Sequence, residues 1–142
     1  MNRSRYGHGV TALNGLLYVL GGFNSINEPL NTTQVFDPVA KSWNEIANMG
    51  YSRAYPACTA MDGRLYVCGG LNEYGGNKLS SCELYDPVTN SWTSLPSMMR
   101  KKTHAAAIGF DGKIYITGGL DDETVLNSVE VCSVYNSKTH IQ

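Results

Sequence analysis

The sequence contains the same segment three times, and this repetition limits the possible folds more than any other feature. Residues 5–22, 53–70 and 102–119 align without a gap, and the glycine pairs that end them are 48 and 49 residues apart. A second segment, residues 35–43, returns 49 residues later as residues 84–92. A unit that recurs with this period buries its apolar surface by stacking against its neighbours. The sequence therefore predicts an array of stacked units.

Each repeat begins with a predicted β-hairpin. Asn14-Gly15, Asp62-Gly63 and Asp111-Gly112 stand between two apolar runs. Such pairs suit a type I′ turn because both central residues need a positive φ. The run after the turn, residues 17–20 in the first repeat, has the aliphatic and tyrosine content of a strand buried on both faces. The strand ends where glycine allows close backbone approach, at Gly21, Gly22, Gly69, Gly70, Gly118 and Gly119.

The remainder of each repeat predicts two more strands. A polar loop leads to a third strand, which ends at Asp-Pro, a dipeptide that opens a turn, and the fourth strand starts near a tryptophan. Such an antiparallel meander exposes apolar side chains on both faces, and radial stacking of several sheets into a β-propeller buries them. We therefore expect the aromatic side chains to pack between sheets, namely Tyr18, Phe36, Trp43, Tyr66, Tyr85 and Trp92.

The motif positions resemble those of a known family. A double glycine, an aromatic residue before Asp-Pro and a tryptophan six residues after the aspartate together resemble the kelch repeat. The resemblance covers essentially the whole chain, with repeats expected at residues 1–49, 50–98 and 99–142. The residues around these positions, such as 95–98, are most similar to the propellers of BTB–BACK–kelch proteins.

The third repeat departs from this pattern. Lys102 stands where the first two repeats have arginine, Asn136-Ser137 replaces Asp-Pro, and Gln142 stands where the tryptophan is expected. The predicted fold class is all-β: a kelch β-propeller fragment with two complete four-stranded antiparallel blades and an incomplete third that lacks its outer strand. Open ends predict self-association or dependence on further blades. The irregular third repeat argues against two copies closing into a six-bladed ring.

The resemblance implies a protein–protein interaction module. In the BTB–BACK–kelch family the propeller captures a substrate protein, and BTB and BACK domains, neither of which lies in these 142 residues, link it to a cullin–RING E3 ubiquitin ligase. We expect substrate recognition of this kind, with an actin-binding or cytoskeletal scaffolding module as the alternative. The family binds partners at one end of the propeller, which makes the candidate partner-binding residues Arg5, Tyr6, Asn24, Arg53, Tyr55, Asn72, Tyr74, Lys102 and His104.

Two interpretations of the basic residues remain open. Arginine can bind a carboxylate through two parallel hydrogen bonds, and exposed tyrosines supply contact area. A ring formed by Arg5, Arg53 and Lys102 would therefore favour an acidic peptide. Alternatively, each of these residues anchors its own loop to an adjacent blade.

The sequence offers little for catalysis or metal binding. The histidines His8, His104 and His140 share no position in the repeats, and no nucleophile elbow, metalloprotease motif or P-loop occurs. A copper site like that of galactose oxidase, which is also built on a kelch propeller, needs several histidine and tyrosine ligands at one end of the axis. The acidic run at residues 121–123 is interpreted as a solvated loop. We therefore predict that the protein is not an enzyme and has no cofactor or metal.

Charge and cysteine content indicate the environment. The net charge of -1, from 11 basic and 12 acidic residues, is not typical of nucleic-acid binders. No secretory signal or membrane span is apparent. The cysteines form no C-x-x-C pair, and Cys58, Cys68 and Cys82 lie in apolar surroundings that suit reduced, structural thiols. These features predict a cytoplasmic protein with no nucleic-acid or membrane partner.

Overall fold

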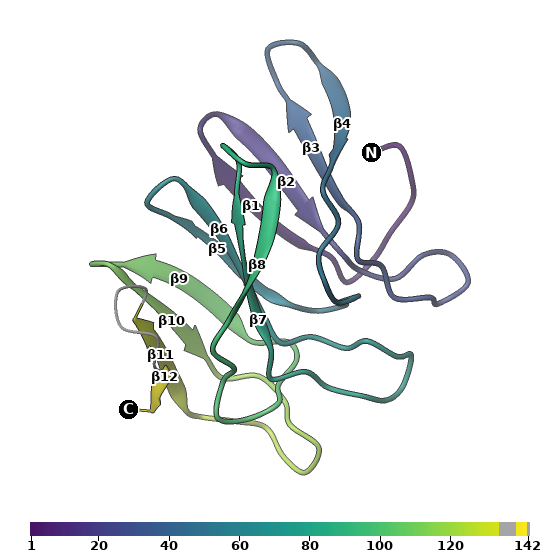
Figure 1. Cartoon of the computed structure of the whole chain (residues 1–142). Helices are drawn as coiled ribbons and strands as arrows, with labels where there is room; N and C mark the ends of the chain where they lie inside the picture. The colour runs from purple at the N-terminus through teal and green to yellow at the C-terminus, as the bar shows by residue number, and fades with distance from the viewer. Residues whose placement is uncertain (134–138, 142) are drawn as a thin grey trace.

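The structure is a computed structural model that describes residues 1–133 and 139–141, so the predicted turn at Asn136-Ser137 and the position of Gln142 lie outside the described residues. Every helix or strand assigned in this part of the chain is a β-strand, and the strands form three antiparallel sheets (Figure 1). Consecutive strands are hydrogen-bonded neighbours in each sheet. The predicted all-β antiparallel fold is confirmed.

Each sheet falls within one sequence repeat. The first sheet consists of β1 (Gly9–Leu13), β2 (Leu16–Leu20), β3 (Thr33–Asp37) and β4 (Ser42–Ile46). The second consists of β5 (Ala57–Met61), β6 (Arg64–Cys68), β7 (Cys82–Asp86) and β8 (Ser91–Leu95). The third consists of β9 (Ala106–Phe110), β10 (Lys113–Thr117), β11 (Val129–Ser133) and β12 (Thr139–Ile141).

The hairpin turns lie where the glycine-containing pairs predict them. Asn14 has a φ of 52° and Gly15 a φ of 78°, and the corresponding values at Asp62 and Gly63 are 50° and 75°. Positive φ at both central residues is the requirement of a type I′ turn, whose twist matches that of the flanking strands. The first two strands of each sheet are therefore specified by local turn chemistry.

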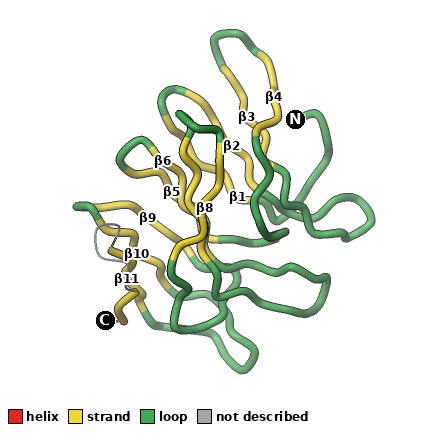
Figure 2. The backbone as a smooth tube through the Cα atoms, in the orientation of Figure 1, coloured by secondary structure: helices red, strands yellow, loops and turns green. Residues whose placement is uncertain are grey.

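The three sheets are arranged radially, as blades of a partial β-propeller. The first strands lie innermost and contact one another, β1 with β5 and β5 with β9, while the later strands spread outward (Figure 1). The tight hairpin turns lie at one end of the molecule, and the long loops after β2, β6 and β10 lie at the other (Figure 2). The linkers between sheets also reach this second end, which we call the loop end.

The third sheet is more regular than the sequence predicts. β12 pairs with β11, with Cys132 opposite Thr139, so a short fourth strand is present where the sequence predicts none, while the third blade is less complete than the other two, as predicted. β12 has three residues where β4 and β8 have five each, so the outer strand is shortened. The register also places Thr139, rather than Gln142, at the position of Trp43 and Trp92.

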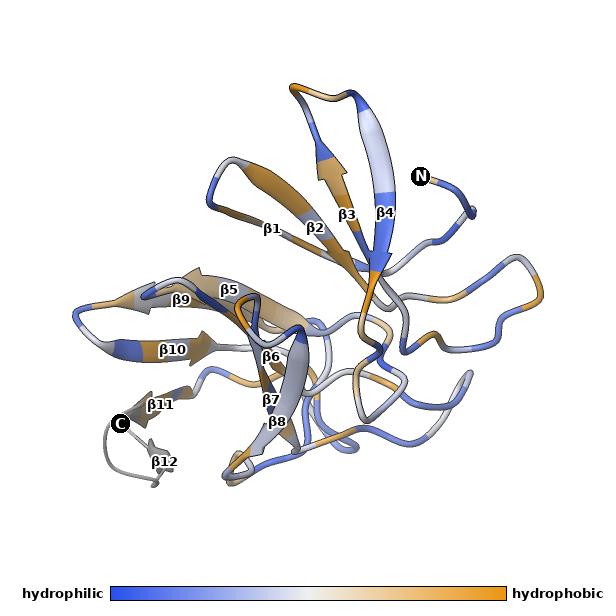
Figure 3. Ribbon diagram, turned by 45° about the horizontal axis from the view of Figure 1, so that its top comes forward, coloured by the Kyte–Doolittle hydropathy of each residue, from blue (hydrophilic) through white to orange (hydrophobic). Residues whose placement is uncertain are grey.

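Two apolar cores fill the interfaces between neighbouring sheets. We call the interface between the first and second sheets the first seam, and the interface between the second and third sheets the second seam. The first seam contains alternate residues of β2 and β6, namely Tyr18, Leu20, Leu65 and Val67. The second seam repeats the arrangement with β6 and β10, namely Tyr66, Cys68, Ile114 and Ile116. Because side chains alternate across a strand, β6 contributes to both cores and must be apolar on both faces. Figure 3 shows the same apolar character along β2.

Main-chain hydrogen bonds repeat across both seams. The Gly22 N–H donates to the Arg53 carbonyl at 2.7 Å, and the Arg53 N–H donates to the Leu30 carbonyl at 3.0 Å. Equivalent bonds of 2.9 and 3.1 Å cross the second seam, from Gly70 to Lys102 and from Lys102 to Leu79. The stacking of the sheets is therefore specified by the backbone as well as by the cores.

Glycine allows the close approach that these bonds require. A Cβ atom at Gly21 or Gly69 would overlap the carbonyl oxygen of Arg53 or Lys102 across the seam. Both glycines also have a positive φ, +62° and +66°, which residues with a side chain rarely adopt. The predicted close approach at the glycine pairs is confirmed at both seams.

The two tryptophans have different surroundings. Trp92 packs against the core of the first seam, and its Nε1 donates to the Ala47 carbonyl of the linker at 2.8 Å, as expected for packing between blades. Trp43 contacts Phe36 of its own sheet, with ring centroids 5.0 Å apart. By its register Trp43 faces away from the second sheet, so the predicted contact with a neighbouring blade is not made among the described residues.

The cysteines are structural residues of the seams. None of the four, all of which lie in the described part of the chain, forms a disulfide, and Cys68, Cys82 and Cys132 are buried. Burial raises the pKa of Cys58 to about 11, so its thiol stays protonated and behaves as a small apolar group. As for membrane association, no helix in the described part of the chain could serve as a span.

Candidate protein-binding surface

Short bridges hold the loop end together. In each repeat, the linker that enters the sheet forms an antiparallel bridge with the loop that follows the glycine pair: Tyr6 with Phe23, Ala54 with Leu71, and Thr103 with Leu120. The two kinds of loop that carry the predicted site residues therefore lie side by side in every repeat.

Arg53 lies inside the loop end and is 0% exposed. Its guanidinium donates to the Glu83 carboxylate at 2.9 Å and to the carbonyl oxygens of Gly69 and Ser81 at 2.8 and 2.9 Å. The other Glu83 oxygen accepts the Gly50 N–H at 2.6 Å. This ion pair ties the linker to the glycine pair and to β7 of the same sheet.

Lys102 repeats this arrangement in the third sheet. Its Nζ lies 2.8 Å from Glu130 Oε1, and both side chains are 1% exposed. The other Glu130 oxygen accepts the Met99 N–H at 2.7 Å. A lysine ammonium is a compact charge without the planar fork of arginine, yet Lys102 fills the same position.

Arg5 holds the equivalent position in the first sheet with different partners. Its Nη1 donates to the carbonyl oxygens of Gly21 and Thr32 at 2.9 and 3.2 Å. Gln34 stands at the register position of Glu83 and Glu130, so this anchor lacks the carboxylate. Burial lowers the pKa of Arg5 from its ordinary value.

The three basic residues therefore direct their charged groups into the protein rather than toward solvent. They occupy equivalent positions, as predicted, but their charged groups are buried and already bonded to the protein. Withdrawing Arg53 or Lys102 to meet a partner would leave a buried carboxylate without a counter-ion, which is strongly unfavourable. Their burial does not favour the predicted contact of Arg5, Arg53 and Lys102 with an acidic peptide, which stays a prediction. Their role is to anchor, and they do so within their own sheets rather than to an adjacent blade.

Ring side chains from loops of all three sheets meet at the loop end. Phe23 is buried at the centre, and the rings of Tyr6, Tyr55 and Tyr74 contact it with centroid distances of 5.4, 6.2 and 5.6 Å. His104 stacks on Tyr55 at 4.0 Å. We call these five residues the aromatic cluster. Tyr6, Tyr74 and His104 are exposed and Tyr55 is half-buried, and together they connect loops of all three sheets.

Two members of the aromatic cluster adopt an unusual backbone conformation. Tyr55 and His104 have φ values of 51° and 57°, which are uncommon for bulky residues. Gly7 is their equivalent in the first repeat, and a Cβ there would lie 2.9 Å from the Tyr55 ring. The His104 N–H donates to the Tyr55 carbonyl at 3.1 Å, so this conformation belongs to the connection between sheets. Burial and, secondly, the charge of Lys78 lower the pKa of His104.

Asn24 and Asn72 shape their own loops. Asn24 Oδ1 accepts the N–H groups of Ile26 and Glu28 at 3.0 and 2.9 Å. Asn72 Oδ1 accepts a hydrogen bond from Asn77 Nδ2 at 2.7 Å. Asparagine often bonds nearby backbone in this way at the start of a turn. We expect these two residues to affect a partner through the shape of the loops.

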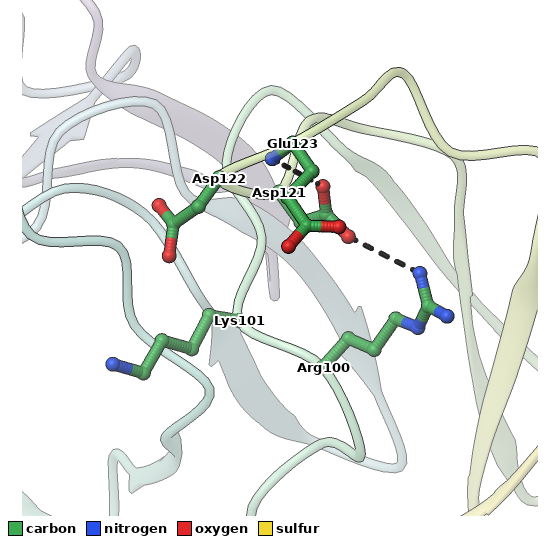
Figure 4. Close-up of a pocket in the computed structure, with 5 residues that line it drawn as sticks. All are labelled: Arg100, Lys101, Asp121, Asp122 and Glu123. Carbon is green, nitrogen blue, oxygen red and sulfur yellow. Dashed lines mark hydrogen bonds and ion pairs between the residues drawn. The ribbon is translucent and has the colours of Figure 1, made fainter.

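Charged residues border a hollow beside the third sheet (Figure 4). The hollow, of about 280 Å³, is lined by Arg100 and Lys101 on one side and by residues 121–123 on the other. Asp121 accepts backbone N–H groups from Glu123 and Thr124 and a hydrogen bond of 3.1 Å from Arg100. The backbone hydrogen bonds, followed by Arg100, lower the pKa of Asp121. This carboxylate therefore organises the acidic loop.

Histidine, cysteine and acidic side chains are the possible metal ligands of the chain. The described residues bring together no group of three or more of them that could hold a metal ion. His8 and His104 belong to different repeats, and the side chain of His140 lies outside the described part of the chain.

The repeated sheets match a known family. Comparison with protein-family models identifies the Kelch motif in residues 4–50, 52–99 and 101–140. The chain belongs to the kelch family. Each kelch motif corresponds to one of the three sheets, and kelch repeats generally serve as non-enzymatic modules for protein–protein interaction.

Three buried residues that support the loop end were not predicted from the sequence. Phe23, the centre of the aromatic cluster, follows a glycine pair at a position where the other repeats have leucine. Glu83 and Glu130 are the buried partners of the basic anchors. An available signal was the acidic residue that occupies the second position of both β7 and β11, where a solvated residue has no reason to recur.

Proposed function

We propose that this kelch protein binds a segment of another protein at its loop end, through the aromatic cluster. The observation that carries the proposal is the exposure of Tyr6, Tyr74 and His104 around the buried Phe23. Tyrosine supplies a large apolar area with a polar tip and loses little conformational entropy on binding, so it is enriched in interaction hot spots.

The charges around the aromatic cluster favour a neutral or basic segment. Lys78 is paired with Asp122 at 3.0 Å, and Arg100 with Asp121 at 3.1 Å. Glu28, Glu73 and Glu123 remain exposed without an ion-pair partner among the described residues, against Lys101 alone at this end. Complementary charge accelerates association and disfavours the wrong partner. We therefore propose a segment that carries lysine or arginine in place of the acidic peptide.

In the cell, we propose that the captured protein is a substrate of a cullin–RING E3 ubiquitin ligase, to which BTB and BACK domains would connect the kelch repeats. The residues around the motif positions, such as 95–98, resemble those of BTB–BACK–kelch propellers, and this resemblance supports the role. The four free cysteines accord with a reducing, cytoplasmic setting. Actin binding is the alternative role, and co-sedimentation with actin filaments distinguishes it.

The binding proposal is tested with a displayed library of random peptides selected on the purified chain. We expect enrichment of peptides with lysine or arginine, lost in the variants Tyr6→Ser and Tyr74→Ser. Val39→Ser is the matched control, because Val39 is exposed in a turn between β3 and β4, away from the loop end. No enrichment, or enrichment unaffected by either tyrosine, contradicts the proposed surface. Enrichment of acidic peptides contradicts the proposed charge preference.

A further inference from the structure

The outer sides of the first and third sheets have the composition of open seams. Leu17 of β2 is 40% exposed, whereas its equivalents Leu65 and Ile114 are 0% and 1% exposed inside the two seams. On the third sheet, Phe110 is 67% exposed, whereas its equivalent Leu13 is 8% exposed. Both outer sides therefore present apolar side chains at positions that are buried elsewhere in the chain.

Two further residues enlarge these surfaces. Val10 of β1 and Ile108 of β9 are exposed. The equivalent of Val10 is Cys58, which packs into the first seam, and the equivalent of Ile108 is Thr59, which accepts the Gly109 N–H across the second seam at 3.0 Å. Val10 thus faces away from the second sheet on one side, and Ile108 faces away from it on the other.

Three methionines at equivalent positions indicate that the outer side of the first sheet is suited to contact another sheet. Met49 and Met98 follow the first and second sheets and pack into the first and second seams, where they are 2% and 4% exposed. Met1 precedes Met49 by 48 residues and is 50% exposed. Met1 is therefore the seam-filling residue of a seam that would lie on the outer side of the first sheet.

On the outer sides, main-chain groups equivalent to those bonded across the two seams have no neighbouring sheet within the described residues. On the third sheet, the equivalents of the donor and acceptor in the two seams are the Gly119 N–H and the Leu126 carbonyl, which bond no further sheet within the described residues. Gly118 has a φ of +63°, but the position of the neighbouring carbonyl is empty there, and the nearest atom to a Cβ would be Leu126 O at 3.5 Å. On the first sheet, the equivalent of Arg53 and Lys102 is Arg5.

We propose that the outer side of the third sheet binds the outer side of the first sheet of a second copy of this chain. The Gly119 N–H donates to the Arg5 carbonyl of the second copy, whose Arg5 N–H donates to the Leu126 carbonyl and whose Met1 enters the new seam. Each proposed contact uses the residues equivalent to those that form the corresponding contact in the first and second seams.

The contact is head-to-tail, and such contacts form a closed ring when the rotation between copies allows it. Two copies of a chain with three sheets give six blades, within the range of roughly four to eight that propellers have. The irregular third repeat argued against this closure while its outer strand was expected to be missing. The presence of β12 weakens that objection, because the third sheet also has a fourth strand, although a shorter one.

The first measurement is the molar mass of the chain by light scattering after size-exclusion chromatography, over a range of concentrations. We expect a single species of twice 15.5 kDa, with the Gly119 amide protected from hydrogen exchange. A monomer, a series of larger oligomers, or a dimer in which Gly119 exchanges freely would overturn the proposal. The molar mass and the exchange of Gly119 are measured on the unchanged chain, so this test of the proposal does not depend on the folding of any variant.

Two variants test the interface itself. Leu17→Asp places a carboxylate on the outer side of the first sheet, and Phe110→Asp places one on the outer side of the third. Each is expected to give a folded monomer, because both residues are exposed within one chain. Val88→Asp is the matched control at a turn residue that is 91% exposed, and it should remain dimeric.

Mixing the two variants distinguishes a head-to-tail contact from a symmetric one. In an equimolar mixture, the unchanged third sheet of the Leu17→Asp chain can meet the unchanged first sheet of the Phe110→Asp chain. We expect a two-chain species to return in the mixture and in neither variant alone. A dimer that survives both substitutions, or a mixture that stays monomeric, contradicts the proposal.

Discussion

The guanidinium of Arg53 and the carboxylate of Glu83 form a buried ion pair that also holds the main chain at Gly50 and Gly69. Removal of one partner from such a pair leaves the other charge buried without compensation, which costs about 3–5 kcal/mol. The pair therefore matters less for its own attraction than for the linker and glycine backbone that it fixes.

Arg53→Ala is expected to lower the free energy of unfolding by about 3–5 kcal/mol, since Glu83 then stays buried and unpaired. Arg64→Ala is the matched control, because Arg64 pairs with Asp86 at 3.3 Å on the surface, where such pairs contribute about 0–1 kcal/mol. Urea denaturation of both variants measures the difference. Equal losses would show that the burial of Arg53 has little energetic weight.

His104 is expected to make stability depend on pH. Burial lowers its pKa in the folded state, so the unfolded chain takes up a proton first as the pH falls. Stability from this residue is complete above the unfolded pKa of about 6.5 and is lost as the pH falls from there toward the folded pKa. His104→Phe keeps a ring on Tyr55, and it should lose less stability than the wild type between pH 7.5 and 5.5 in urea titrations. His8 is present in both proteins, so a difference reports on His104.

The positions of these residues could be predicted from the sequence, but the direction of their side chains could not. Arg5, Arg53 and Lys102 have matched offsets from the glycine pairs, and the structure places them equivalently. Whether a cation meets solvent or a carboxylate depends on Glu83, which is 30 residues from Arg53 and adjacent only after the sheet has formed. Phe23 was missed because its importance arises from rings on other loops.

Strands with strong local signals were predictable, and β12 was not. Each hairpin depends on a glycine-containing turn whose conformation is set by two residues. β12 has neither Asp-Pro before it nor a tryptophan in it, and its pairing comes from the exposed edge of β11. An unpaired strand edge can recruit a segment of weak intrinsic preference, because its N–H and carbonyl groups are already aligned.

Trp92→Ala is expected to destabilise the protein by about 3 kcal/mol, at the lower end for a large aromatic residue because the ring is half-buried. Trp43→Ala is the matched control at the same register position. Trp43 contacts Phe36 and lacks the bond to the linker that Trp92 makes with Ala47, so a smaller loss is expected. Thermal unfolding of both variants measures the comparison, and a larger loss for Trp43→Ala would contradict it.

Over the whole molecule, the two seams are the only apolar cores within the described residues, and each forms between neighbouring sheets. The stability of such an array is approximately the sum of its units and of the interfaces between neighbours. The second sheet takes part in both interfaces, whereas the outer sheets take part in one each. Damage to one seam should therefore separate one outer sheet while leaving the other pair joined.

Gly69→Ala is expected to open the second seam, because the added methyl group would overlap the Lys102 carbonyl. Gly63→Ala is the matched control: Gly63 also has a positive φ, +75°, but nothing lies within 4 Å of an added Cβ. Both variants bear the backbone cost of roughly 1–2 kcal/mol, and only Gly69→Ala should also expose the core to a hydrophobic dye. Equal dye binding in the two variants would refute a role for Gly69 in the seam.

The loops after β2, β6 and β10 span 12, 13 and 11 residues, although the seam bonds recur at fixed positions of the repeat. The seam donor and acceptor of the first sheet, Gly22 and Leu30, lie near the two ends of such a loop, so the number of residues between them can vary while the seam bonds stay in place. An insertion in such a loop can redirect recognition without altering assembly. A duplicated repeat inherits both halves of a seam and can join an existing array at once. In evolutionary terms, a chain of this kind can lengthen by duplication of whole repeats and diversify by insertions and substitutions in its loops.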